Sequence, residues 1–303
     1  MLGSRGRGRH RVRGRAGGSA TTAAAVAVAV LMAVTGVGRT PAAEAAPQFA
    51  ATSVLAAGAV PVGSRQVFLG NYDTGDFAQW STCQWRGFNG DCKDWKPTGN
   101  YIAQVLADGT SHPTAARFEV RNGDIPPFGG GERAEVRAGS SSGADVYEGD
   151  ERWYQFSLKF DQSFRNPTGT FYVAMQWHAG DGSPPLALEI SRLGVLQFAN
   201  NRTGKRTDIA PIQRGVWVDY VVHAKFSKGS SAYAEAWVNG VKTPFVHRYP
   251  NMASTKNYLK MGVYRDAAET ATAIVWQDGL RAMTSGTATF TRSFARYDVA
   301  LGA

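Results

Sequence analysis

Three short segments of this 303-residue chain alternate apolar side chains with polar ones that can bind anions and exchange protons. They read Arg-x-Glu-x-Arg at 133–137, Gln-x-His at 176–178 and Tyr-x-Lys-x-Gly-x-Tyr at 258–264. A guanidinium and a carboxamide can neutralise a carboxylate through hydrogen bonds. An imidazole and a phenol can take up or donate a proton. These residue types predict a site that binds an acidic ligand and transfers protons on it.

Strands would position these side chains, because successive residues of a β-strand point to opposite faces. The expected polar faces carry Arg133, Glu135 and Arg137 in the first strand, Tyr172, Ala174, Gln176 and His178 in the second, and Tyr258, Lys260, Gly262 and Tyr264 in the third. Each strand alone has an ordinary explanation, since an Arg and a Glu two residues apart commonly form an ion pair. Together the three faces predict a concave, cationic sheet that binds an acidic polymer, with Gly262 leaving room for the bound chain.

The rest of the sequence predicts a scaffold built from strands. Apolar and polar residues alternate with a period of two between clusters of Gly, Pro, Asn and Asp, and no long helical stripe is present. This pattern predicts an all-β fold, a jelly-roll sandwich of two antiparallel sheets with a concave substrate-binding face. The expected strands are 101–106, 115–121, 132–138, 152–160, 171–178, 186–191, 194–199, 216–226, 232–238, 258–265 and 271–281.

The N-terminal residues read as a targeting segment. Residues 1–46 combine arginines, an apolar stretch at 20–37 and a small-residue cleavage site at 43–46, which is typical of a secretory signal peptide. A membrane anchor is the alternative, since about 18 apolar residues could just span a bilayer. We then expect a flexible linker at 47–66 and one domain at 67–303. The mature protein is predicted to be secreted, extracellular, monomeric and not attached to a membrane.

The net charge of +9 is concentrated in the targeting segment. Seven of the 33 basic residues precede Ala46, which leaves 26 basic and 23 acidic residues, a charge of only +3. This small surplus, without a recognisable basic motif, argues against nucleic-acid binding. The partner that we expect is an acidic polysaccharide.

The two cysteines, Cys83 and Cys92, are predicted to form a disulfide in an oxidising compartment. No histidine lies near enough in sequence to complete a metal site with them, so we assign no metal to the active site. Acidic turns at 73–76 and at Asp278 could hold a structural Ca²⁺, although solvated turn residues are the simpler interpretation. No cofactor is expected to be required.

The three motifs, in this order and at about this separation, resemble those of the jelly-roll polysaccharide lyases. That group includes heparin lyase I-like enzymes, glucuronan lyases and jelly-roll alginate lyases, and the run from Phe68 to Arg121 is most similar to the heparin lyase I group. The resemblance covers roughly residues 66–283. Two departures leave the substrate open: Trp177 replaces the usual Ile or Val, and Arg265 replaces the residue that follows the last Tyr in alginate lyases.

The resemblance implies cleavage of a 4-linked uronate by β-elimination, in which the C5 proton is removed and the C4 oxygen is expelled. It assigns Arg133 and Gln176 to the carboxylate, and His178 and Tyr264 to proton transfer. Either His178 is the base and Tyr264 the acid, or Tyr264 fills both roles on one face of the sugar. The further substrate-binding residues that we expect are Arg137, Lys260, Arg117, Tyr258, Tyr172 and Arg265. The candidate substrates are glucuronan, alginate and heparin-like chains.

Two other functions fit a secreted β-sandwich. A retaining glycoside hydrolase needs two carboxylates about 5 Å apart, but Glu119 and Glu135 each lie between arginines and look like ion-pair partners. A non-catalytic carbohydrate-binding module could use the eight tryptophans and eleven tyrosines for stacking. Such a module has no need of His178 and Tyr264 beside a cationic groove.

Overall fold

The computed structural model describes residues 64–96, 99–110 and 112–284. The predicted signal peptide at 1–46, nearly all of the predicted linker and the tail from residue 285 lie outside the described residues. The strand β1 begins at Gln66. Within the described residues, no helix is long and apolar enough to cross a membrane.

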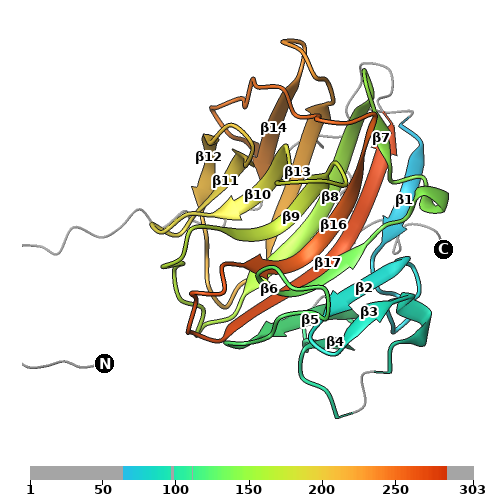
Figure 1. The fold of residues 1–303 in the computed structure, drawn as a ribbon, viewed down its shortest axis with the longest axis vertical. Coiled ribbons are helices and arrows are strands. Elements are labelled where there is room, and N and C mark those ends of the chain that lie inside the picture. The colour runs from blue at the N-terminus through green and yellow to red at the C-terminus, as the bar shows by residue number, and fades with distance from the viewer. Residues whose placement is uncertain (1–63, 97–98, 111, 285–303) are drawn as a thin grey trace, which may run out of the picture. The chain divides into compact units, whose positions relative to one another are not determined.

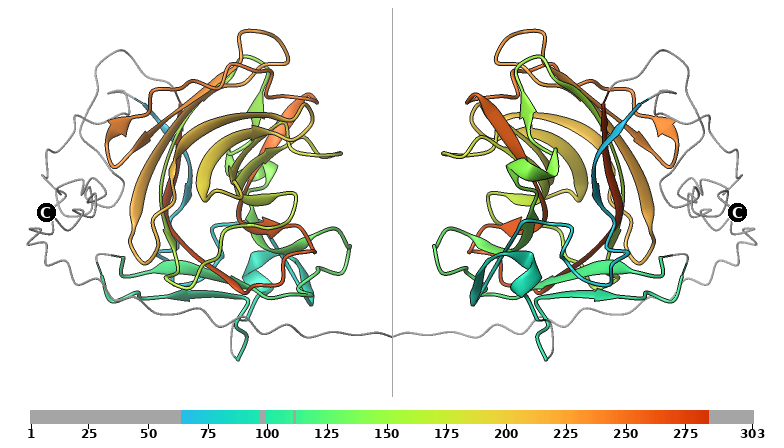
Figure 2. Two further views of the ribbon diagram at one scale, coloured as in Figure 1. Left: turned by 90° about the vertical axis from the view of Figure 1, so that its left-hand side faces the viewer. Right: turned by 90° about the vertical axis from the view of Figure 1, so that its right-hand side faces the viewer.

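The described residues form two antiparallel sheets that face each other, as Figures 1 and 2 show. The first is an eight-stranded sheet of order β15-β14-β13-β8-β17-β5-β4, in which β1 also pairs with β17. Its strands are β1 (Gln66–Gly70), β4 (Ala103–Leu106), β5 (Ala115–Val120), β8 (Glu151–Phe160), β13 (Val218–Lys225), β14 (Tyr233–Val238), β15 (Val241–Lys242) and β17 (Ala273–Thr284).

The second is a nine-stranded sheet of order β12-β11-β10-β9-β16-β6-β2-β3, in which β7 also pairs with β16. The three segments with polar faces lie side by side at its centre, on β9, β16 and β6. Its strands are β2 (Thr82–Trp85), β3 (Phe88–Gly90), β6 (Glu132–Arg137), β7 (Val146–Tyr147), β9 (Tyr172–His178), β10 (Leu186–Ile190), β11 (Val195–Asn200), β12 (Lys205–Pro211) and β16 (Lys256–Arg265).

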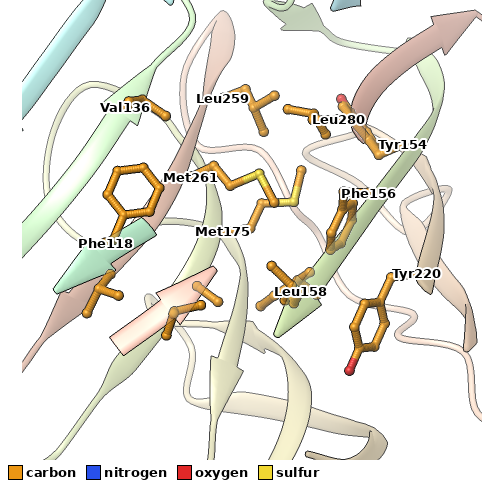
Figure 3. Close-up of a cluster of buried hydrophobic side chains, with 14 of the residues drawn as sticks. Phe118, Val136, Tyr154, Phe156, Leu158, Met175, Tyr220, Leu259, Met261 and Leu280 are labelled. Atoms are coloured by element: carbon orange, nitrogen blue, oxygen red, sulfur yellow. The ribbon is translucent and has the colours of Figure 1, made fainter. Parts of the chain in front are cut away.

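One hydrophobic core fills the space between the sheets. Figure 3 shows Met175 and Met261 from the nine-stranded sheet meeting Phe156 and Leu158 from the eight-stranded sheet. Because these residues alternate with polar ones, the polar residues of β6 and β16 point away from the core. We call this outward side of the nine-stranded sheet the open face.

The prediction of an all-β sandwich with two antiparallel sheets is confirmed, and each of the eleven expected strands overlaps an observed one. Six strands were not expected from the sequence: β1, β2, β3, β7, β12 and β15. Most of these are short, and β12 is an edge strand with mostly exposed side chains. A strand of two to five residues is too short for its alternation to stand out in the sequence, and a mostly exposed edge strand has little apolar face to show.

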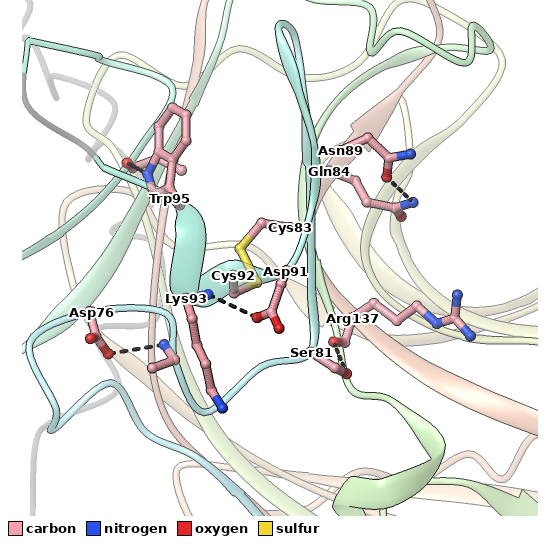
Figure 4. Close-up of a disulfide and its surroundings, with 12 residues drawn as sticks. Asp76, Ser81, Cys83, Gln84, Asn89, Asp91, Cys92, Lys93, Trp95 and Arg137 are labelled. Carbon is pink, nitrogen blue, oxygen red and sulfur yellow. Dashed lines mark hydrogen bonds between the residues drawn. A yellow bond between two sulfur atoms is a disulfide. The ribbon is translucent and has the colours of Figure 1, made fainter.

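The predicted disulfide between Cys83 and Cys92 is confirmed (Figure 4). It ties the β2–β3 hairpin to the 3₁₀ helix η1 (Cys92–Asp94). On the same side, Trp85 packs against Trp95 with ring centroids 4.7 Å apart. The hairpin is thereby fixed at the edge of the nine-stranded sheet, next to β6.

Candidate active site

A cleft of about 300 Å³ lies on the open face of the nine-stranded sheet. The structure brings Arg133, Gln176, His178 and Tyr264, which lie far apart in the sequence, to the walls of this one cleft. Its other lining residues are Thr170, Phe171, Val173, Gly182, Ser183, Pro184, Asn201 and Arg206.

Strand pairing explains why the three motifs converge. β16 lies between β9 and β6 and pairs with both. Tyr264 is opposite Arg133 on β6, whereas Tyr258 is opposite His178 on β9. Residues directly opposite each other share a face. At Gly262, φ is +138°, and a Cβ would lie 2.2 Å from the Ala134 carbonyl oxygen, so glycine is required here for the close approach of β6.

Glu135 is the centre of the polar network beneath the cleft. It accepts hydrogen bonds from Arg133 at 2.9 Å, from Gln176 at 2.5 Å and from Lys260 at 2.5 Å. Burial would raise the pKa of Glu135, but the charges of Lys260 and Arg133 outweigh it and hold the pKa below its ordinary value. Burial also lowers the pKa of Lys260 to about 8, although Glu135 opposes this shift. Glu135 is therefore a carboxylate that orients three neighbouring side chains.

Tyr264 is held between a cation, an aromatic ring and a tight loop. The Arg133 guanidinium lies 3.8 Å from the centre of its ring, and the Phe171 ring packs at 4.7 Å. A Cβ on Gly131 would lie 2.9 Å from the Tyr264 ring and 2.2 Å from the Arg265 carbonyl oxygen. Only glycine allows the loop to pack this closely, which fixes the phenol at the cleft.

The hydrogen bonds of His178 define its tautomer. Its Nδ1 accepts from the backbone N–H of Gly180 at 2.9 Å and lies 3.1 Å from the Tyr258 hydroxyl. Because a backbone N–H can only donate, the neutral ring carries its proton on Nε2. Burial and the positive charge of Lys260 lower the pKa of His178 from its ordinary value. His178 is accordingly a neutral side chain, and a hydrogen bond with the Gly182 backbone opposes part of this shift.

Three predicted substrate-binding residues, Arg137, Tyr258 and Lys260, lie on the open face. The Arg137 guanidinium is 3.9 Å from the centre of the Tyr258 ring. Burial raises the pKa of Tyr258, so the ring stays a neutral phenol. Among the described residues, Arg137 forms no ion pair with a carboxylate. Its charge therefore remains for a ligand.

The placement of Tyr172 on the polar face is wrong, because β9 does not alternate along its whole length. The register shifts against both β16 and β10 between Met175 and Val173. Val173 therefore lines the cleft, and both Tyr172 and Ala174 turn into the core. Tyr172 is 2% exposed, and burial raises its pKa.

The predicted roles of Arg265 and Arg117 in substrate binding are also wrong. Arg265 follows Tyr264 directly and so points to the opposite face, where it is 1% exposed and pairs with Glu132 at 2.8 Å. Arg117 lies on β5 in the eight-stranded sheet, on its outward side, and pairs with Glu119 at 2.5 Å. Both arginines have structural partners away from the cleft.

The sequence did not indicate the side of the cleft formed by β10–β12. Arg206 lines the cleft and pairs at 3.2 Å with Glu189, whose pKa is raised by burial. A second hollow of about 100 Å³ shares Thr170, Phe171 and Arg206 with the cleft and extends it. Arg206 was not found because β12 was not predicted as a strand. Its pairing with β11 would have had to be known to place Arg206 at the cleft.

Several solved structures have a fold similar to that of this chain. The fold is similar to an endo-β-1,4-glucuronan lyase from the fungus Trichoderma reesei, with 14% identity, TM-score 0.53 and coverage of 73% of this chain and 96% of that chain. It is also similar to the catalytic domain of a glycoside hydrolase family 131 protein from Coprinopsis cinerea, with 14% identity, TM-score 0.54 and coverage of 75% and 97%. A third similar structure is alginate lyase AlgAT5 from polysaccharide lyase family 7, with 15% identity, TM-score 0.50 and coverage of 68% and 95%.

At these identities the structural likeness shows the fold alone, which both lyases and a hydrolase share. No curated protein matches the sequence significantly. Residues 72–281, more than half of the chain, match the family described as polysaccharide lyase, and the chain therefore belongs to the polysaccharide lyase family.

Proposed function

We propose that this polysaccharide lyase cleaves an unsulfated chain of 4-linked uronates by β-elimination in the open-face cleft. The observation that carries the proposal is the meeting of Arg133, Gln176, His178 and Tyr264 on the walls of one cleft. The lyase family fixes the class of reaction. The roles of the individual residues follow from their contacts.

Arg133 and Gln176 would neutralise the substrate carboxylate. The C5 proton is too weakly acidic to be removed while the adjacent carboxylate keeps its full charge. Glu135 holds one N–H of each side chain, so their remaining N–H groups can donate to the carboxylate as negative charge develops.

Tyr264 would carry out both proton transfers. As a phenolate it takes the proton from C5, the electron pair forms the C4–C5 double bond, the C4–O bond breaks, and Tyr264 returns the proton to the leaving oxygen. His178 does not fit the role of base, because its accepting nitrogen is occupied by Gly180. A single acid–base group requires that the C5 proton and C4 oxygen lie on one side of the sugar, as in β-D-glucuronate and β-D-mannuronate.

The charges of the open face favour unsulfated chains over the heparin-like alternative. Most of its cations already have acidic partners: Arg133 and Lys260 pair with Glu135, and Arg206 pairs with Glu189. Among the residues that the structure describes, Arg137 has no acidic partner and so can bind an additional anion. A sulfated chain would present several more charges per sugar and would meet Glu189 in the extension of the cleft.

The site does not provide the carboxylate pair of a glycoside hydrolase. None of the described residues that line the cleft is acidic. Glu119 and Glu135 lie in different sheets. Glu135 and Glu189 are three strand spacings apart, roughly 14 Å, beyond the ~5 to 9.5 Å of hydrolase pairs.

We also propose that the enzyme acts outside the cell as a monomer and requires no metal. The disulfide supports an oxidising compartment.

No metal is needed to neutralise the substrate carboxylate, because Arg133 and Gln176 already supply the groups that do so. Two carboxylates of the acidic turns that could hold Ca²⁺ have protein partners: Asp278 contacts His112 at 2.5 Å, and Asp76 accepts from the Ala78 N–H at 2.9 Å. Activity should therefore persist after treatment with EDTA.

The test is digestion of a panel of polymers containing glucuronan, alginate fractions rich in mannuronate or guluronate, and heparin. The expected result is release of 4,5-unsaturated product, detected by its ultraviolet absorbance, from the glucuronate or mannuronate chains. Tyr264→Phe, the matched control, should lower turnover by about a hundredfold or more, the scale of a lost acid–base group, while the protein stays folded. Cleavage confined to guluronate or heparin would contradict the proposal.

A further inference from the structure

We infer that the disulfide-tied β2–β3 hairpin carries an additional sugar-binding site, made by Gln84, Asn89 and Arg137, which we call the hairpin subsite. It would hold a uronate further along the chain than the one whose bond breaks. The inference rests on the proposed function, since it assumes that an acidic polysaccharide lies on the open face.

The sheet continues from β6 into the hairpin without a change of face. β2 pairs with β6 so that Gln84 is opposite Glu135, and β3 pairs with β2 so that Asn89 is opposite Gln84. The alternate residues Cys83 and Trp85 are buried in the core. Figure 4 shows Gln84, Asn89 and the end of the Arg137 side chain on the side of the hairpin away from the disulfide. The open face therefore extends beyond the cleft.

The two carboxamides are arranged to bind hydroxyl groups. Gln84 Nε2 donates to Asn89 Oδ1 at 3.2 Å. This bond uses the acceptor of Asn89 and one donor of Gln84, so within the described residues the Asn89 NH₂ group and the Gln84 carbonyl oxygen remain for a ligand. Asn89 is exposed and Gln84 is half-buried. A sugar hydroxyl both donates and accepts, which matches an adjacent donor and acceptor.

Arg137 gives the hairpin subsite its charge. It is opposite Thr82 of β2, so its side chain borders Gln84 along the strand. As noted above, it lies over the Tyr258 ring and has no acidic partner among the described residues. One unpaired guanidinium beside two carboxamides suits a single carboxylate on a hydroxyl-rich ring, which is an unsulfated uronate.

The other side of the hairpin holds these groups in place before the ligand binds. The disulfide joins Cys83 to Cys92, and the Asp91 side chain accepts from the Lys93 N–H at 3.0 Å to cap η1. Phe88 and Trp95 pack together at 5.2 Å. Groups fixed in this way lose little freedom on binding. Because neighbouring strands are ~4.8 Å apart, β2 and β3 add roughly 10 Å of surface, enough for a further sugar ring.

The experiment compares the full-length wild type with Gln84→Ala/Asn89→Ala and with a control, Gln66→Ala, an exposed glutamine in the eight-stranded sheet. Each protein digests the preferred polyuronate and a size-graded series of its oligosaccharides. The double variant should lose about tenfold in kcat/KM on the polymer, the scale of two hydrogen bonds at a sugar, mostly through KM. The loss should shrink as the oligosaccharide shortens, and the control should match the wild type throughout.

An equal loss at every length would overturn the inference, because it would indicate damage to the cleft itself. No loss on the polymer would overturn it as well. Failure of the proposed function is separately visible, since the wild type would then release no unsaturated product. In that case retardation of the same proteins in gels containing the polyuronate decides: weaker retardation of the double variant supports the hairpin subsite, and equal or absent retardation overturns it.

Discussion

Two strands of this lyase carry almost the same sequence in different sheets. Arg-Phe-Glu-Val-Arg at 117–121 begins in β5 and ends one residue beyond it, and β6 contains Arg-Ala-Glu-Val-Arg at 133–137. In the first motif both arginines pair with the central glutamate, Glu119, at 2.5 and 2.6 Å. The motif satisfies its own charges and leaves no cation for a ligand.

The second motif meets different neighbours. Glu135 takes Arg133 and the Lys260 ammonium of β16 as partners, so Arg137 has no acidic partner within the part of the chain that the structure describes. The aromatic partners differ too, because Arg117 lies 5.9 Å from the Trp276 ring, whereas Arg133 lies over Tyr264, which can exchange a proton. The motif alone therefore does not make a substrate-binding site. The adjacent strand decides whether the same residues stabilise the sheet or face a substrate.

The same substitution in the two motifs should have very different effects on activity. Arg133→Lys should lower kcat/KM by about a hundredfold or more, because lysine cannot form the forked contact to a carboxylate whose charge must be neutralised. Arg117→Lys should leave kcat/KM near the wild-type value. Initial rates of unsaturated product measure both, with circular dichroism to confirm folding. Equal losses would show that the two motifs are not functionally distinct.

The central glutamates offer a second matched pair. Glu135→Gln leaves Arg133 and Lys260 buried without a counter-ion, which should cost about 3 to 5 kcal/mol in the free energy of unfolding. It should also reduce kcat, because Arg133 and Gln176 lose the group that orients them. Glu119→Gln should be less destabilising and leave kcat unchanged. Urea titration and steady-state kinetics test the pair, and a normal kcat for Glu135→Gln would refute its positioning role.

Glu119 pairs with two arginines, whereas Glu135 pairs with Arg133 and Lys260. Loss of the Lys260 charge should have the smallest effect on kcat/KM. Burial lowers its pKa to about 8. As the pH rises through that value, Lys260 loses its proton, the open face loses a positive charge, and kcat/KM should fall by about fivefold, near 1 kcal/mol. Lys260→Met should have lower activity below pH 8 and should lack this fall. An unchanged descending limb in the pH profile of the variant would contradict the assignment.

The sequence was sufficient wherever strands alternate regularly. β6 and β16 keep a strict alternation, so their open-face residues could be assigned correctly. The prediction from alternation was wrong near Ala174, where a register shift turns Tyr172 into the core. Such a bulge cannot be recognised in a single sequence. Arg117 was misassigned because a motif does not reveal its sheet. The contribution of β12 to the cleft was missed because edge strands lack the buried face that reveals them.

β-Elimination and hydrolysis are distinguished by the mass of the fragments released from a purified glucuronate or mannuronate oligosaccharide. If Arg133, Gln176, His178 and Tyr264 act together in β-elimination, the masses of the two wild-type fragments sum to that of the starting chain, with no water added. Tyr264→Phe should release almost none of either fragment. Fragments that together carry one added water, or full cleavage by Tyr264→Phe, would contradict the claim.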